Sequence, residues 1–120
     1  MRSIILGEVS KYVENKESQD EQITVRCIGH SLGGALAMIN AADLSQYAKL
    51  KWNGNVTVSC CTFGAPAAGN RAFAEYFNDN VIDSTRVVVQ DDPITYLPCF
   101  PWFSVSLQIS CVQLEHVTLL

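Results

Sequence analysis

Residues 23–36 read ITVRCIGHSLGGAL, and this stretch decides the fold. Its first part, Ile23 to Ile28, is short and rich in β-branched residues, which predicts a β-strand. A glycine-rich turn follows over 29–34. From Leu32 to Leu50, apolar residues recur at helical spacing among several alanines, which predicts a helix packed closely on its neighbour. A strand, a turn and a helix in this order are the unit from which parallel sheets are built.

The rest of the chain repeats this alternation. Helices are predicted over 4–16 and 72–80, and further strands over 56–63, 85–90 and 104–114. The order of elements predicts an α/β fold, with a mostly parallel sheet and helices on its faces. The strand at 56–63 is almost wholly apolar, which is typical of a strand buried on both faces. A chain of 120 residues without an internal boundary forms one domain at most.

Composition excludes several classes of function. The net charge is -4, from 8 Lys and Arg against 12 Asp and Glu, and no basic cluster is present, which argues against a nucleic-acid partner. No apolar stretch approaches the length of a transmembrane segment, and no signal-peptide pattern opens the chain. The five cysteines form neither a CxxC pair nor a metal-binding spacing with histidine. Reduced thiols and a cytoplasmic location are the default expectation.

The turn contains the motif that carries chemistry. Gly29-His30-Ser31-Leu32-Gly33 is G-x-S-x-G between a predicted strand and a predicted helix, the context of a nucleophile elbow. On such a turn the backbone of Ser31 is strained and its Oγ stands above the sheet edge. We expect side chains at 29 and 33 to collide, so that both positions require glycine. We also expect the Leu32 amide to help bind an oxyanion. The alternative is a turn in which Ser31 is an ordinary helix N-cap.

Three segments resemble one family. Residues 28–37, IGHSLGGALA, resemble the elbow of the class 3 lipases, the fungal-type α/β-hydrolases that include plant phospholipase A1 and triacylglycerol lipases. Residues 62–70, TFGAPAAGN, resemble its T-F-G-x-P-x-x-G-N segment. Residues 86–98, RVVVQDDPITYLP, resemble the segment that holds the acid of the catalytic triad. The resemblance is strongest over 4–98 and implies that 1–120 is a partial domain of the α/β-hydrolase three-layer sandwich.

The resemblance also implies a mechanism. Ser31 would hydrolyse a lipid carboxylic ester, of an acylglycerol or a phospholipid, through an acyl-enzyme, with Asp92 as the acid. By elimination His116 is the candidate base, in the chain order Ser, acid, His, although it lies closer to Asp92 than the family usually places it. His30, inside the elbow, is implied to pack and to point away from Ser31. No metal or organic cofactor is implied, and the partner is a lipid ester, at a membrane or a lipid-droplet interface.

Two other interpretations stay open. No segment before residue 4 corresponds to the loop that gives the family its second oxyanion donor, and the chain resembles the middle of a lipase domain. It is therefore either an active hydrolase or a truncated, catalytically silent fragment that at most binds lipid or a partner. A third interpretation is an esterase or thioesterase of the same fold.

Overall fold

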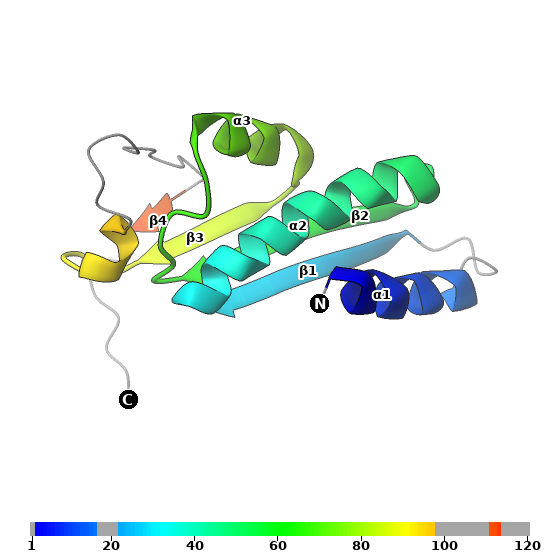
Figure 1. Cartoon of the computed structure of the whole chain (residues 1–120), viewed down its shortest axis with the longest axis horizontal. Coiled ribbons are helices and arrows are strands. Elements are labelled where there is room, and N and C mark those ends of the chain that lie inside the picture. The colour runs from blue at the N-terminus through cyan, green and yellow to red at the C-terminus, as the bar shows by residue number, and fades with distance from the viewer. Residues whose placement is uncertain (1, 17–21, 98–110, 114–120) are drawn as a thin grey trace.

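The computed structural model describes residues 2–16, 22–97 and 111–113. These residues form a parallel sheet with helices packed against it (Figure 1). In chain order the elements are α1 (Arg2–Lys16), β1 (Ile23–His30), α2 (Leu32–Lys51), β2 (Val56–Phe63), α3 (Arg71–Asn80), β3 (Ser84–Val88), the 3-10 helix η2 (Pro93–Tyr96) and β4 (Cys111–Gln113). None of the described helices is long and apolar enough to span a membrane.

The sheet has the order β1-β2-β3-β4, and every neighbouring pair is parallel. Strands β1 and β2 pair along their whole length, from Ile23 opposite Val56 to His30 opposite Phe63. Because all the strands are parallel, their carboxyl ends and the turns that follow them lie at the same edge of the sheet. This carboxyl edge is where α/β proteins of this kind place their chemistry.

All three α-helices pack on one face of the sheet. The main core joins α2 and α3 to β2 through side chains such as Met38, Phe77 and Val58, all of them buried. A second cluster joins α1 to the far end of α2 through Val13 and Trp52. The alanines of α2 lie in these contacts, since a small side chain lets a helix approach the sheet closely. In Figure 1, α2 runs along the sheet while α1 lies beside β1.

The opposite face carries no helix among the described residues. Its polar part is tied across strands: the Thr24 and Thr57 hydroxyls lie 3.1 Å apart, and the Arg26 Nε donates to the Ser59 Oγ at 3.2 Å. Towards the carboxyl edge it becomes apolar, and Ile28 is 63% exposed. The described residues therefore supply two layers, as expected for part of a three-layer sandwich.

Most predicted elements are present within one or two residues of their expected ends. The strand predicted over 85–90 is shorter, since β3 ends at Val88. The strand predicted over 104–114 falls largely outside the described residues, and its described part, 111–113, pairs with β3 as β4. The expectation that the strand at 56–63 is buried on both faces is wrong. Its helix-covered face is buried from Val56 to Thr62, but on the open face only Ser59 is buried and Phe63 is 42% exposed.

Cys60 gives the fold a predictable dependence on alkaline pH. Burial raises the pKa of this thiol to about 12, with smaller contributions from Cys27 and Cys61. Because the folded pKa lies above the unfolded one, the contribution to stability is complete below the unfolded pKa and is lost as the pH rises towards about 12. We expect urea denaturation to show a larger fall in the free energy of unfolding between about pH 8 and about pH 10.5 for the native chain than for Cys60→Ala. Equal falls in the two proteins would contradict this.

Candidate active site

Ser31 joins β1 to α2 with a strained backbone. Its φ is 54° and its ψ is -129°, a combination that residues with a Cβ rarely adopt. Its amide donates to the Phe63 carbonyl at 2.9 Å, and its own carbonyl accepts from the Gly34 amide at 2.9 Å. The other described non-glycine residues with positive φ are Asn53, Asp83 and Asp91. Asn and Asp tolerate this region through their short polar side chains, so Ser31 is the exception.

The Ser31 side chain is not used to begin the helix. Ser31 occupies the N-cap position of α2, but its hydroxyl makes no capping hydrogen bond. The interpretation of Ser31 as an ordinary capping serine is therefore wrong. Leu32 is the first helical residue, and its N–H has no acceptor inside the helix. The elbow thus presents a hydroxyl and an amide at the positive end of a helix of 20 residues.

Three glycines have different roles in this turn. A Cβ at Gly29 would lie 2.1 Å from the Gly33 carbonyl oxygen, so glycine is required there as expected. A Cβ at Gly33 would meet nothing within 4 Å, and the expectation that Gly33 avoids a collision of its own is wrong. It is the backbone of Gly33 that fills the space beside Gly29. The sequence motif did not include Gly34, where a Cβ would lie 2.6 Å from the Ala65 Cβ.

Asp92 lies after β3 and has two separate oxygen environments. Its Oδ1 accepts from the Ile94 amide at 3.0 Å and caps η2. Its Oδ2 faces the turn after β2, where a Cβ at Gly64 would lie 3.0 Å from it. Gly64 has a φ of 55°, which favours glycine for a second reason. The carboxylate thus serves as a cap and still directs one oxygen to the sheet edge.

The turn after β2 lies between the elbow and the acid. Phe63 binds the Ser31 amide, and the next residue, Gly64, lies against Asp92. The structure therefore brings the predicted nucleophile and the predicted acid to one edge, on either side of a shared turn. His30 is exposed, so the expectation that it packs is wrong, and its Nε2 lies 3.9 Å from the position that a Cβ at Gly64 would take.

The candidate base cannot be placed in the same way. His116, the candidate base, lies outside the described residues and stays a prediction. Among the described residues, no cluster of three His, Cys, Asp or Glu side chains is arranged to hold a metal ion.

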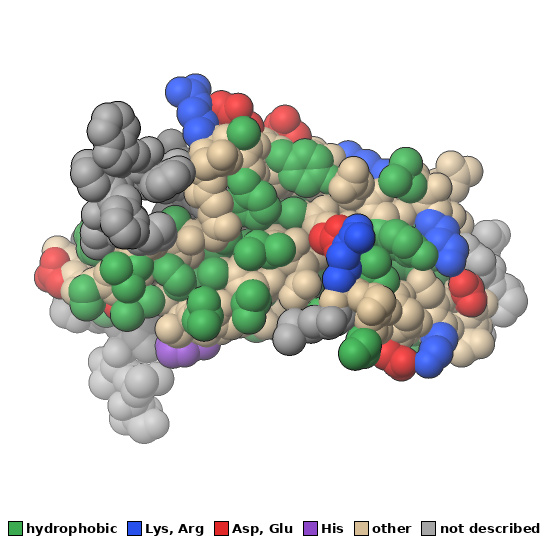
Figure 2. All heavy atoms as spheres, in the orientation of Figure 1, with side chains coloured by type: hydrophobic (Ala, Val, Ile, Leu, Met, Phe, Trp, Pro, Cys, Tyr) green, Lys and Arg blue, Asp and Glu red, His purple; other side chains and the backbone are tan. Residues whose placement is uncertain are grey.

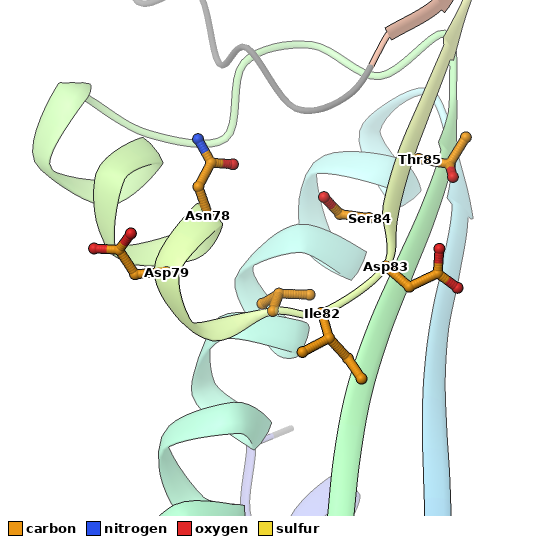
Figure 3. Close-up of a pocket in the computed structure, with 7 residues that line it drawn as sticks. Asn78, Asp79, Ile82, Asp83, Ser84 and Thr85 are labelled. Carbon is orange, nitrogen blue, oxygen red and sulfur yellow. The ribbon is translucent and has the colours of Figure 1, made fainter.

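A hollow of about 600 Å³ lies away from this edge, between the end of α3 and the start of β3 (Figure 3). Its wall includes Asn78, Asp79 and Asp83. Since β3 is parallel to β1 and β2, its first residues lie at the edge opposite the elbow. The hollow is therefore separate from the candidate site.

The strand–turn–helix unit at Ser31, the parallel sheet and the position of Asp92 after β3 fit part of an α/β-hydrolase domain. The chain also matches the family described as lipase (class 3) over residues 1–102. It therefore belongs to the class 3 lipase family.

Its relatives include plant and fungal enzymes. It is 38% identical over 97 residues to phospholipase A1 EG1, chloroplastic/mitochondrial, of Oryza sativa subsp. indica, covering 81% of this chain and 22% of that protein. It is 37% identical over 90 residues to lipase A of Sodiomyces alcalophilus, covering 65% of this chain and 20% of that protein. The chain thus spans about a fifth of the length of these relatives.

Solved lipase structures share the fold. M37 lipase superposes with a TM-score of 0.59 at 33% identity, over 69% of this chain and 25% of that chain. The lipase from Rhizopus microsporus var. chinensis gives a TM-score of 0.56 at 30% identity, over 81% of this chain and 33% of that chain.

The glycines allow a matched test of the elbow. Gly34→Ala places a methyl group against Ala65, and we expect it to lower the free energy of unfolding by about 1–3 kcal/mol in urea denaturation. Gly33→Ala adds the same atom in open space within a helix, where alanine is favoured, and should be neutral or stabilising by up to about 1 kcal/mol. Equal destabilisation by the two changes would contradict the packing described here.

Proposed function

We propose that this chain carries the nucleophile and the acid of a serine-dependent hydrolase of lipid carboxylic esters. The observation that carries the proposal is Ser31 at the start of α2. Its backbone is strained, and its hydroxyl makes no capping hydrogen bond to the helix. A capping hydrogen bond at this position is worth about 1 kcal/mol, and backbone strain costs about 1–3 kcal/mol. A turn that forgoes the first and accepts the second is typical of a functional site. Membership of the class 3 lipase family supports the same chemistry.

In the proposed reaction, the Ser31 Oγ attacks the ester carbonyl carbon while a base takes the hydroxyl proton. The carbonyl electrons move onto oxygen, where the Leu32 amide donates a hydrogen bond. The tetrahedral intermediate then expels the alcohol, which takes the proton from the base and leaves an acyl-enzyme. Water attacks the acyl-enzyme by the same route and releases the fatty acid, which regenerates Ser31.

Asp92 is proposed to orient the base. Its Oδ1 is held by the Ile94 amide, so the direction of the carboxylate is fixed and Oδ2 is left to accept from an imidazole N–H. The chain order assigns that imidazole to His116. Neither role depends on a metal or an organic cofactor.

Apolar side chains around the elbow support a lipid substrate. Leu32, Leu36, Ile94 and Leu97 are all exposed at or near the carboxyl edge. Figure 2 shows hydrophobic side chains gathered at the end of the molecule where α2 begins and η2 lies. A patch of this kind suits acyl chains, and we propose that the ester is presented at a membrane or lipid-droplet interface. The relatives named phospholipase A1 and lipase leave both phospholipid and acylglycerol as substrates.

A silent, lipid-binding fragment is the second candidate. It is favoured by one observation: the single histidine among the described residues is His30, which is exposed beside the Gly64 turn. In this case the apolar edge would bind lipid while Ser31 stays inactive.

Labelling with a fluorophosphonate tests the proposal directly. We expect the purified chain to be labelled, and the label to be lost in Ser31→Ala. Asp92→Asn and His116→Ala should slow labelling by about 10²–10⁴-fold, because the serine then lacks a correctly oriented base. The measurement is the labelling rate by mass spectrometry, with circular dichroism to show that each variant is folded.

The outcomes separate the candidates. A folded native chain that takes no label would refute the hydrolase proposal and favour the silent fragment. Labelling that does not change in His116→Ala would assign the base to another group. Faster hydrolysis of long-chain esters in emulsion than of short soluble esters would distinguish a lipase from an esterase.

A further inference from the structure

Arg86 joins the two turns that surround Asp92. It lies on β3, and its Nη2 donates to the Ala65 carbonyl at 2.8 Å and to the Thr95 carbonyl at 3.1 Å. Ala65 belongs to the turn after β2, and Thr95 belongs to η2 after β3. In Figure 1 both segments lie at the end of the sheet where β3 stops. One guanidinium nitrogen therefore ties together two loops that are separate in the sequence.

Each of these two bonds leads to the candidate acid. The amide and the hydroxyl of Thr95 donate to the Asp92 carbonyl at 3.2 and 2.8 Å, so the residue held by Arg86 holds Asp92 in turn. On the other side, Ala65 follows Gly64, whose Cβ position would lie 3.0 Å from the Asp92 Oδ2. Arg86 thus fixes both walls of the space in which the carboxylate lies.

The partial burial of the Arg86 guanidinium lowers the stability of the fold relative to an apolar side chain at this position. Its Nε is buried and has no hydrogen-bond partner among the described residues. The Oγ1 of Thr62, which is in register with Arg86 on β2, is also buried without a partner there. Arg86 is half-buried, and no ion pair with a carboxylate is found for it among the described residues. Removing part of an unpaired guanidinium from water costs free energy that an apolar side chain would avoid. This cost indicates that Arg86 is present for the hydrogen bonds that its Nη2 donates to the two loops.

We propose that Arg86 is a positioning residue for Asp92. Its two hydrogen bonds hold the Ala65 turn and η2 at a fixed separation, which keeps the Asp92 Oδ2 directed along the carboxyl edge towards the base. We call these two hydrogen bonds the Arg86 clamp. The clamp itself does not depend on the proposed function, whereas its catalytic consequence does. A displacement of a supporting group by about 1 Å can cost about 100-fold in rate, so the loss of the clamp should be visible in the activation of Ser31.

Two replacements of Arg86 separate positioning from packing. Arg86→Met keeps much of the length and apolar volume but has no donor, while Arg86→Lys keeps N–H groups and the charge. We expect Arg86→Met to remain folded and to be labelled by a fluorophosphonate about 10–100-fold more slowly. Arg86→Lys should recover at least part of that loss. Arg71→Met, at an arginine that is 88% exposed and pairs with Glu75, is the control and should label normally.

Amide hydrogen exchange tests the clamp without any activity. The Ala67 amide donates to the Leu97 carbonyl across the same two loops, and the Ile94 amide donates to Asp92. In Arg86→Met we expect both amides to exchange about tenfold faster or more, while the Ile82 amide, bonded to Val58 at the other edge, is unchanged.

The two measurements fail in different ways. If the native chain takes no label but the exchange pattern is as expected, the proposed function fails and the clamp stands. If Arg86→Met labels at the native rate, or if Ala67 and Ile94 keep their protection in that variant, the positioning role of Arg86 is overturned.

Discussion

The site depends on two backbone approaches that only glycine permits. A Cβ at Gly29 would lie 2.1 Å from the Gly33 carbonyl oxygen, and a Cβ at Gly34 would lie 2.6 Å from the Ala65 Cβ. The first contact lets α2 begin directly at the end of β1. The second brings the start of α2 against the turn after β2. Together they place Ser31 at the tip of the elbow, close enough to β2 for its amide to bond the Phe63 carbonyl.

Burial of apolar side chains in the core behind the elbow offsets the free-energy cost of this geometry. Ser31 carries strain of about 1–3 kcal/mol, and the unpaired polar atoms near Arg86 add further cost. Against this, Met38 and Phe77 are almost fully buried between the helices and β2, and burial of one such side chain is worth about 1.5–3 kcal/mol. The apolar cluster thus lies under α2 and α3, and the strained and polar groups lie at the carboxyl edge. Stability and chemistry are separated along the direction of the strands.

Local pattern was enough to predict most of the fold. The strand Val56–Phe63 and the start of the helix at Leu32 follow from periodicity over a few residues, and Ser31 follows from a motif within one turn. The environment of Asp92 needed more, because the position after a strand does not show which of its oxygens is free. That assignment depends on Gly64, which only the pairing of β2 with β3 brings near.

Contacts between distant segments could not be predicted. Nothing in the sequence near Gly34 shows that Ala65 will lie against it, and glycine spacing alone gave Gly33 the role that belongs to Gly34. The bonds from Arg86 to Ala65 and Thr95 depend on the order of strands and on the paths of two loops. In each case the deciding partner is set by the assembled sheet rather than by neighbouring residues.

The N-cap residues of the described helices differ in whether their side chains make a capping hydrogen bond. Asn70 caps α3 by accepting from the Phe73 amide at 3.0 Å, and Asp92 caps η2 by accepting from the Ile94 amide. Ser31 occupies the same position before α2 and caps nothing. For Asp92 the capping bond orients the second oxygen, so the structural and functional interpretations of this residue are compatible. For Ser31 they exclude each other, since a hydroxyl turned back to the helix could not attack an ester. Among the described residues Ser31 is the one serine with a positive φ, and its missing cap is the structural feature that most specifically supports its proposed role as nucleophile.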